Sequence, residues 1–132
     1  YENVEGTQYA SVLSQTIQVS ITDEFGAFLY PNQFVNFTAS SLAVQKGSEL
    51  AYYCNNDTEV VESVYNYIIS TFKYDYDKAK NVKSGYIPDI DEVFTEKTGI
   101  CFDYASVMAA MLRSQSIPTR LEVGYAGDEY HA

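Results

Sequence analysis

Cys101 and His131 are the residues of this sequence whose types and placement could carry out chemistry. A thiol is a weak nucleophile and a thiolate is a strong one; free cysteine has a pKa of about 8.5, which a helix N-terminus or a nearby imidazolium lowers. Cys101 opens an apolar stretch, so it is predicted to lie in the first turn of a buried helix, where unpaired backbone N–H groups favour negative charge. The same N–H groups can line an oxyanion hole for acyl transfer.

His131 is the only histidine of the chain, and it is predicted to lie on a strand that pairs with the strand after the Cys101 helix. A helix N-terminus that faces such a strand can bring a thiol and an imidazole within hydrogen-bonding reach. Taken singly, a cysteine that opens an apolar helix is usually a packing residue, and one histidine near a terminus is usually a surface residue. Together they indicate a nucleophile and its general base, and no metal or cofactor is expected beside them.

A disulfide between Cys54 and Cys101 is the alternative reading of a pair of cysteines in an oxidising compartment. It would make both residues structural. The residues around Cys54 favour instead a buried thiol at the end of an apolar stretch.

The helix that begins at Cys101 is predicted to run to Gln115 and to be central, because its residues are apolar nearly all round. A second helix is predicted over 56–72, where Asn56 and Glu59 have capping-box spacing. Shorter or weaker elements are predicted as follows: a helix start at 11–13, a helix or a strand over 41–53, a short extended piece over 34–37, a loop over 74–85, and a helix over 91–97 that Asp89 or Asp91 caps and Gly99 ends.

Alternating apolar and polar residues predict strands over 16–22 and 119–125, and a further strand is expected to begin near Tyr130 after the turn at Gly127 and Asp128. The predicted class is therefore α+β, with the Cys101 helix packed on an antiparallel sheet. Residues 1–55 are expected to form a front part with short strands, and residues 56–132 the core of one overall domain.

The charge of the chain limits its partners. It has 8 basic and 18 acidic residues, a net charge of −10, and such a field repels the phosphate backbone of nucleic acids. No apolar run reaches the roughly 20 residues that a membrane-spanning helix needs.

Several spaced motifs resemble the core of the transglutaminase-like superfamily. They are Y-I-P-D (86–89), T-G-I-C-F-D-Y-A-S (98–106), M-L-R-S-Q-S-I-P-T-R (111–120), V-G-Y (123–125) and Y-H-A (130–132). The family pattern has glycine where this chain has Ser116, at a helix end where a left-handed backbone is common. Serine adopts that conformation at a cost of about 1 kcal/mol.

The resemblance implies a papain-like Cys-His-Asp site in which Cys101 is the nucleophile and His131 the general base and acid. The third member, usually Asp, would follow Ala132, so the 132-residue chain is expected to lack turnover and to leave its sheet incomplete. The backbone N–H of Cys101 is the expected first oxyanion donor. Tyr86 is a candidate second donor, and a role in packing a turn is its alternative.

The function implied is a thiol enzyme, either a cysteine protease or an acyltransferase, that acts on amide bonds of a protein or peptide through a Cys thioester. The alternative is a binding or structural module of the same fold without catalysis. The whole sequence also resembles secreted or lipid-anchored members from Gram-positive bacteria, which implies an extracellular or cell-envelope location and makes wall peptides one substrate class. An unpaired sheet edge near 119–125 predicts homodimers.

Overall fold

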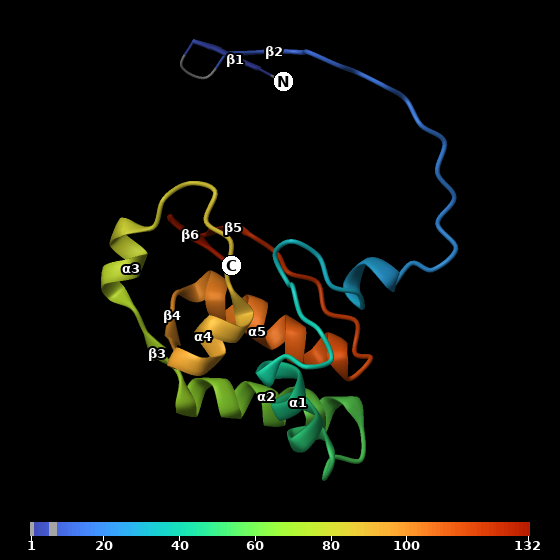
Figure 1. The fold of residues 1–132 in the computed structure, drawn as a ribbon, viewed down its shortest axis with the longest axis vertical. Coiled ribbons are helices and arrows are strands. Elements are labelled where there is room, and N and C mark those ends of the chain that lie inside the picture. The colour runs from blue at the N-terminus through green and yellow to red at the C-terminus, as the bar shows by residue number, and fades with distance from the viewer. Residues whose placement is uncertain (1, 6–7) are drawn as a thin grey trace.

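Helix α5 (Cys101–Ser114) lies at the centre of the protein, and helices α1 (Leu42–Ala51), α2 (Asp57–Thr71) and α4 (Ile90–Glu96) pack around it (Figure 1). The computed structural model describes residues 2–5 and 8–132, with side chains from residue 10 onward. The α+β class with an incomplete sheet is confirmed, because the strands of the described residues form three separate pairs.

The apolar residues of α5 explain its position. Val107, Ala110 and Met111 are completely buried, and they meet Val64 and Ile68 of α2 in one core cluster. Burial of one such large side chain contributes about 1.5–3 kcal/mol. Tertiary packing therefore holds α2, whose β-branched residues give it only modest helical propensity.

The predicted start of α2 is confirmed. The Asn56 side chain accepts a hydrogen bond from the Glu59 backbone N–H at 3.0 Å. The Glu59 carboxylate in turn accepts from the Asn55 backbone N–H and from the Asn56 side-chain amide. The helix start therefore has a capping box in which Glu59 also accepts a hydrogen bond from Asn55, the residue before the cap.

Residues 41–53, predicted as a helix or a strand, contain α1. Gly47 makes its close approach to α5 possible, because a Cβ added at Gly47 would lie 3.1 Å from the backbone oxygen of Met111. Packing thus explains why a glycine lies within this helix.

Helix α4 begins after Asp89, whose side chain accepts from the N–H groups of Asp91 and Glu92. The prediction that Gly99 ends this helix is wrong. Lys97 ends it instead, in a left-handed conformation (φ 55°). Its ammonium group lies 3.0 Å from the centre of the Phe94 ring, so a cation–π contact helps to hold the lysine there.

The prediction of a loop over 74–85 is wrong in part, because it contains the short helix α3 (Tyr76–Asn81). The Asp75 side chain caps α3 by accepting from the Lys78 backbone N–H at 2.8 Å. A six-residue helix without buried residues has no apolar stripe, so the hydrophobic pattern could not indicate it.

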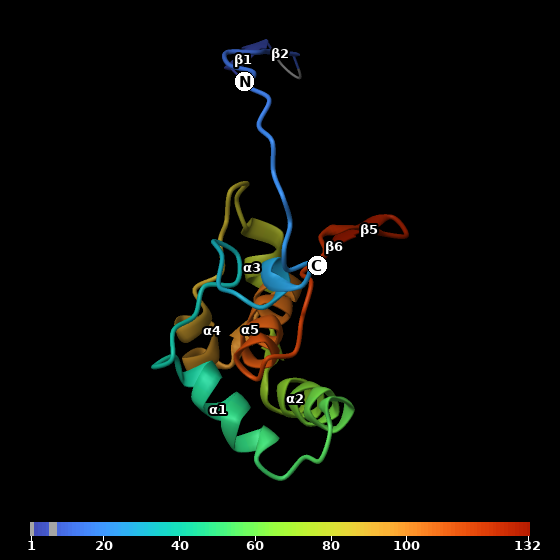
Figure 2. The same ribbon diagram turned by 90° about the vertical axis from the view of Figure 1, so that its right-hand side faces the viewer.

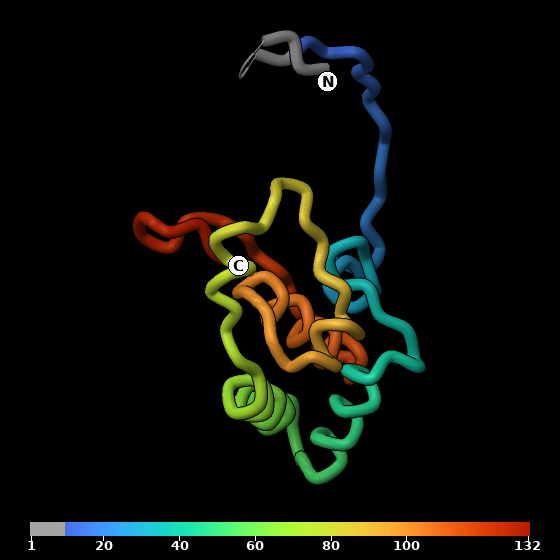
Figure 3. The backbone as a smooth tube through the Cα atoms, turned by 60° about the vertical axis from the view of Figure 1, so that its left-hand side comes forward, coloured from blue at the N-terminus to red at the C-terminus, as the bar shows by residue number. Residues whose placement is uncertain are grey.

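The strands are short. β3 (Lys73–Tyr74) pairs in parallel with β4 (Thr98–Gly99), β5 (Gly124–Ala126) pairs antiparallel with β6 (Glu129–His131), and β1 (Glu2–Glu5) pairs antiparallel with β2 (Gln8–Ala10). The turn at Gly127 and Asp128 is confirmed. Figures 2 and 3 show that the β5–β6 hairpin protrudes from the helices. The strand predicted over 119–125 is wrong for its greater part, because only residues 124–126 are a strand and Val123 is exposed.

The strand predicted over 16–22 and the helix start at 11–13 are wrong. Ile17, Val19 and Ile21 alternate as a strand requires, but each is at least 69% exposed, and the segment follows an extended path away from the helices up to the short 3-10 helix η1 (Gly26–Phe28) (Figure 1). A strand needs a partner for its backbone, and among the described residues this segment has none. Residues 34–37 also form no strand, although Val35 is fully buried.

No helix among the described residues combines the length and the apolar character needed to cross a membrane. The division into residues 1–55 and 56–132 and the formation of homodimers stay predictions.

Candidate functional site

The Cys101 thiol lies where the sequence predicts it, at the first residue of α5 and partly buried. Backbone hydrogen bonds hold the entry to this helix: the Lys73 N–H donates to the Lys97 oxygen and the Asp75 N–H to the Gly99 oxygen, both at 2.9 Å. The pair β3–β4 therefore fixes the backbone immediately before Cys101. The start of a helix favours negative charge, so this position suits a thiolate.

Tyr74, at the end of β3, is the aromatic residue next to the thiol. Partial burial raises the pKa of Tyr74, and the charge of Cys101 raises it further, while a hydrogen bond that the Cys101 backbone N–H donates to the phenol oxygen lowers it. Tyr74 thus interacts with both the backbone and the side chain of Cys101. Since its phenol stays protonated at neutral pH, it is a hydrogen-bond donor at the site.

Asp103 is completely buried two residues after Cys101. Its Oδ2 accepts a hydrogen bond of 2.8 Å from the Ile100 backbone N–H, so it satisfies one of the free N–H groups at the start of α5. This is half of a capping box, because isoleucine has no side-chain oxygen to return the bond. This role of Asp103 was not predicted, although its position three residues after Ile100 could have indicated it.

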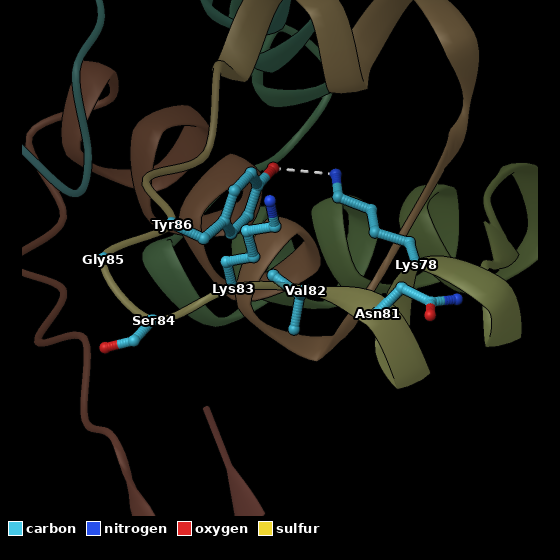
Figure 4. Close-up of a pocket in the computed structure, with 7 residues that line it drawn as sticks. All are labelled: Lys78, Asn81, Val82, Lys83, Ser84, Gly85 and Tyr86. Atoms are coloured by element: carbon cyan, nitrogen blue, oxygen red, sulfur yellow. Dashed lines mark hydrogen bonds between the residues drawn. The ribbon is translucent and has the colours of Figure 1, made fainter.

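Two residues from outside α5 complete the environment of Asp103. Lys78 of α3 forms an ion pair with Oδ2 at 2.8 Å, and the Tyr86 hydroxyl donates to Oδ1 at 2.6 Å. Lys78 also donates to the Tyr86 oxygen at 2.7 Å, which Figure 4 shows as a dashed line. We call Lys78, Tyr86 and Asp103 the carboxylate cluster. No pattern in the sequence indicated Lys78, since it lay in a predicted loop.

Tyr86 therefore has its hydroxyl engaged with Asp103 and Lys78, and the suggestion that it is the second oxyanion donor finds no support. Its alternative, a structural role at the turn before α4, fits the geometry. The side chains of Lys78 and Tyr86 point toward one another at one side of an open pocket (Figure 4). The pocket is lined by Lys78, Asn81, Val82, Lys83, Ser84, Gly85 and Tyr86.

His131 lies on β6 and is exposed. Its Nδ1 is 2.7 Å from the backbone oxygen of Ala132. In the part of the chain that the structure describes, no hydrogen bond joins His131 to Cys101, and the hairpin that carries His131 protrudes from the helices (Figure 2). Its role as the base stays a prediction.

Cys54 and Cys101 are both free thiols, so the disulfide alternative is not what the structure contains. The Cys54 thiol donates to the Leu50 backbone oxygen at 3.3 Å and lies 3.5 Å from the Ser63 hydroxyl. Cys54 is a partly buried thiol satisfied by its neighbours.

Comparison with known proteins identifies the family of the chain. Residues 46–132 match the family model described as the transglutaminase-like superfamily. UPF0252 protein MJ1282 of Methanocaldococcus jannaschii is similar, with 32% identity over 89 residues that make up 61% of this chain and 25% of that protein. The chain therefore spans only about a quarter of this relative's length. No solved structure matches. Because the matched region contains the whole of the thiol helix, its lead-in and the β5–β6 hairpin, the chain belongs to the transglutaminase-like superfamily.

Proposed function

We propose that the protein is the core of a thiol enzyme that acts on amide bonds of proteins or peptides through a thioester on Cys101. The observation that carries the proposal is the position of this thiol, at the first residue of a buried helix and beside the Tyr74 phenol. Membership of a superfamily of thiol enzymes supports it. The cell envelope as its location and wall peptides as a substrate class rest on the resemblance alone.

The proposed reaction has two halves. His131 takes the proton of the Cys101 thiol, and the thiolate adds to the amide carbonyl. The oxyanion so formed accepts hydrogen bonds from the Cys101 backbone N–H and the Tyr74 hydroxyl. The intermediate collapses to a thioester as the C–N bond breaks, and His131 gives a proton to the departing amine. Water or an amine then attacks the thioester and gives its proton to His131, the C–S bond breaks, and the proton passes to the sulfur, which returns the thiol. Hydrolysis and acyl transfer differ only in this last nucleophile.

The reactivity of Cys101 tests the nucleophile. Iodoacetamide labelling from about pH 5 to 10, followed by mass mapping, gives the rate at Cys101 and at Cys54 in one sample. We expect Cys101 to react about tenfold faster near neutral pH and its profile to begin at lower pH than that of Cys54. Limited access slows a thiol equally at every pH, so the profile separates activation from exposure. Equal profiles would contradict the proposal.

Tyr74→Phe tests the oxyanion donor. With p-nitrophenyl acetate as the acyl donor, removal of one donor should slow acylation of Cys101 by about 100-fold. Alkylation by iodoacetamide forms no oxyanion, so its rate should stay within about threefold of the wild type. Tyr76→Phe is the matched control, because Tyr76 is exposed and only packs its ring edge against Tyr74, 5.0 Å between centres. An equal loss in both variants, or in both reactions, would exclude this role for Tyr74.

A binding module without catalysis is the second candidate, and the exposed His131 beside the Ala132 oxygen favours it. The two candidates differ in the acyl enzyme. An acetyl group that appears on Cys101 and is released faster in the wild type than in His131→Ala supports the enzyme. A thiol that acetylates no faster than Cys54 supports the module.

A further inference from the structure

The ion pair between Lys78 and Asp103 joins α3 to the first turn of the thiol helix. We propose that Lys78 is a positioning residue for Cys101: its ammonium group neutralises the buried Asp103 carboxylate, so that this carboxylate can cap α5 without opposing the thiolate two residues away. The inference rests on the proposed function, in which Cys101 is the reactive thiol.

The cap places a negative charge beside the site. Asp103 is fully buried, and its Oδ2 holds the N–H of Ile100, the residue directly before Cys101. An unpaired carboxylate at this depth would disfavour a second negative charge on the neighbouring sulfur. It would also cancel part of the favourable field of the helix N-terminus. A thiol site with this cap therefore needs a compensating cation.

Lys78 provides this cation. Its ammonium group contacts Oδ2 of Asp103 at 2.8 Å and the Tyr86 hydroxyl at 2.7 Å, and it lies 4.6 Å from the centre of the Tyr86 ring. Burial works to lower the pKa of Lys78, but the bonds to Asp103 and Tyr86 raise it above its usual value. The lysine therefore keeps its charge over the whole range in which a thiol titrates.

No other cation contacts Asp103 among the described residues. Three phenols lie near the thiol and its cap: Tyr74, Tyr86 and Tyr104. The groups whose charge acts on them are Cys101, Tyr74, Tyr76 and Lys78 of α3, Asp103 of α5, and Glu129 of β6. Lys78 is the cation of this set, and His131, the proposed base, forms no hydrogen bond or ion pair with Asp103 in the part of the chain that the structure describes. Its removal should therefore act on the thiol through charge, not only through lost packing.

Four proteins test the inference: the wild type, Lys78→Met, Asp103→Asn and the double variant. The measurement is the pH–rate profile of iodoacetamide labelling at Cys101. Lys78→Met should move the profile to higher pH and lower the rate at pH 7 by about tenfold, the factor that corresponds to one pH unit. Asp103→Asn keeps an oxygen for the Ile100 N–H but removes the charge, so it should move the profile to lower pH. The double variant should return to within about twofold of the wild type.

Lys80→Met is the matched control. Lys80 is exposed on the same short helix and should leave the profile unchanged. Lys78→Arg should restore a rate near that of the wild type, since it restores the cation. Near-UV circular dichroism and the Cys54 labelling rate report whether each variant is folded. If Lys78→Met does not fold, Asp103→Asn still tests the sign of the effect.

The outcomes separate the two proposals. If the wild-type Cys101 profile equals that of Cys54, the proposed function fails. If wild-type Cys101 is activated but its profile is the same in Lys78→Met and in Asp103→Asn, this inference fails while the proposed function stands. A double variant as slow as Lys78→Met would also overturn the inference, because the loss would then come from packing and not from charge.

Discussion

The Asp103 side chain lies directly against the backbone of Gly99. A Cβ added at Gly99 would lie 2.7 Å from both Cβ and Oδ2 of Asp103, closer than nonbonded atoms normally approach. Only glycine leaves room for a carboxylate that folds back to cap its own helix. The glycine before the thiol is therefore required by the cap, and not by an unusual backbone dihedral.

Gly99→Ala should consequently destabilise the protein. Either the Asp103 side chain or the β3–β4 pair must move, and overpacking of this kind costs about 1–3 kcal/mol. The measurement is the free energy of unfolding in urea. Gly124→Ala is the control, because a Cβ there meets no heavy atom within 4 Å, and it should change stability by less than about 0.5 kcal/mol. Equal effects of the two substitutions would contradict the close approach.

Arg113 should be the arginine on which stability depends. It is only 4% exposed, and its guanidinium donates to the backbone oxygens of Thr119 at 3.0 Å and Tyr30 at 2.9 Å. Arg113→Ala leaves both carbonyls without their partner, so it should cost about 3 kcal/mol. Arg113→Lys should recover part of this, since an ammonium group cannot reproduce both bonds of the planar group.

Arg120→Ala is the comparison for that experiment. Arg120 pairs with Glu122, but both side chains are about two-thirds exposed (65% and 70%), so the loss should be less than about 1 kcal/mol. Chemical denaturation of the three variants gives the ranking. A larger loss of stability in Arg120→Ala than in Arg113→Ala would contradict the stabilising role of the two Arg113 hydrogen bonds.

Ser116→Gly should stabilise the protein. Ser116 adopts a left-handed conformation with φ 63° two residues after the end of α5, as the sequence pattern predicted for a position that favours glycine. Relief of this strain is worth about 1 kcal/mol, less the entropy that glycine adds to the unfolded chain. Ser116→Val should lower stability instead, because a β-branched residue is still less suited to positive φ. Thermal unfolding decides, and a lower midpoint for Ser116→Gly than for the wild type would be the contrary result.

Stability should fall in alkali through the carboxylate cluster. Burial and the hydrogen bond to Asp103 raise the pKa of Tyr86 above its usual 10.0, and the pKa of Lys78 is also raised above 10.5. The folded protein thus holds both protons more tightly than the unfolded chain. This contribution is complete below the usual pKa values and is lost as pH rises through the raised values of the folded state.

The slope of unfolding free energy against pH above about 10 measures this loss. Tyr86→Phe should reduce the slope, although it also lowers stability at pH 7 by removing a hydrogen bond. Tyr52→Phe serves as the control, since Tyr52 is 79% exposed. An unchanged slope in Tyr86→Phe would show that the cluster has no part in the alkaline transition.

Local signals in the sequence predicted the helices well. Helix boundaries depend on hydrogen bonds or packing between residues that are close in the sequence. This holds for Asn56 with Glu59, for Asp89 before α4 and for the apolar run after Cys101. The strands were harder to predict. Residues 16–22 alternate as a strand should, but whether a strand forms depends on a partner elsewhere, which a local pattern does not contain.

The sequence by itself determined the chemistry that is available: a thiol at a helix N-terminus, one histidine, a core for one buried helix and the family. Tertiary structure decided which charges meet, because Lys78, Tyr86 and Asp103 come from separate segments and join only when β3 pairs with β4 and α3 lies beside α5. It also brought Tyr74 to Cys101 and engaged the Tyr86 hydroxyl with Asp103 and Lys78. Contacts between residues far apart in the chain depend on backbone geometry that residue types and spacing do not encode locally, so the environment of the thiol could be read only from the folded protein.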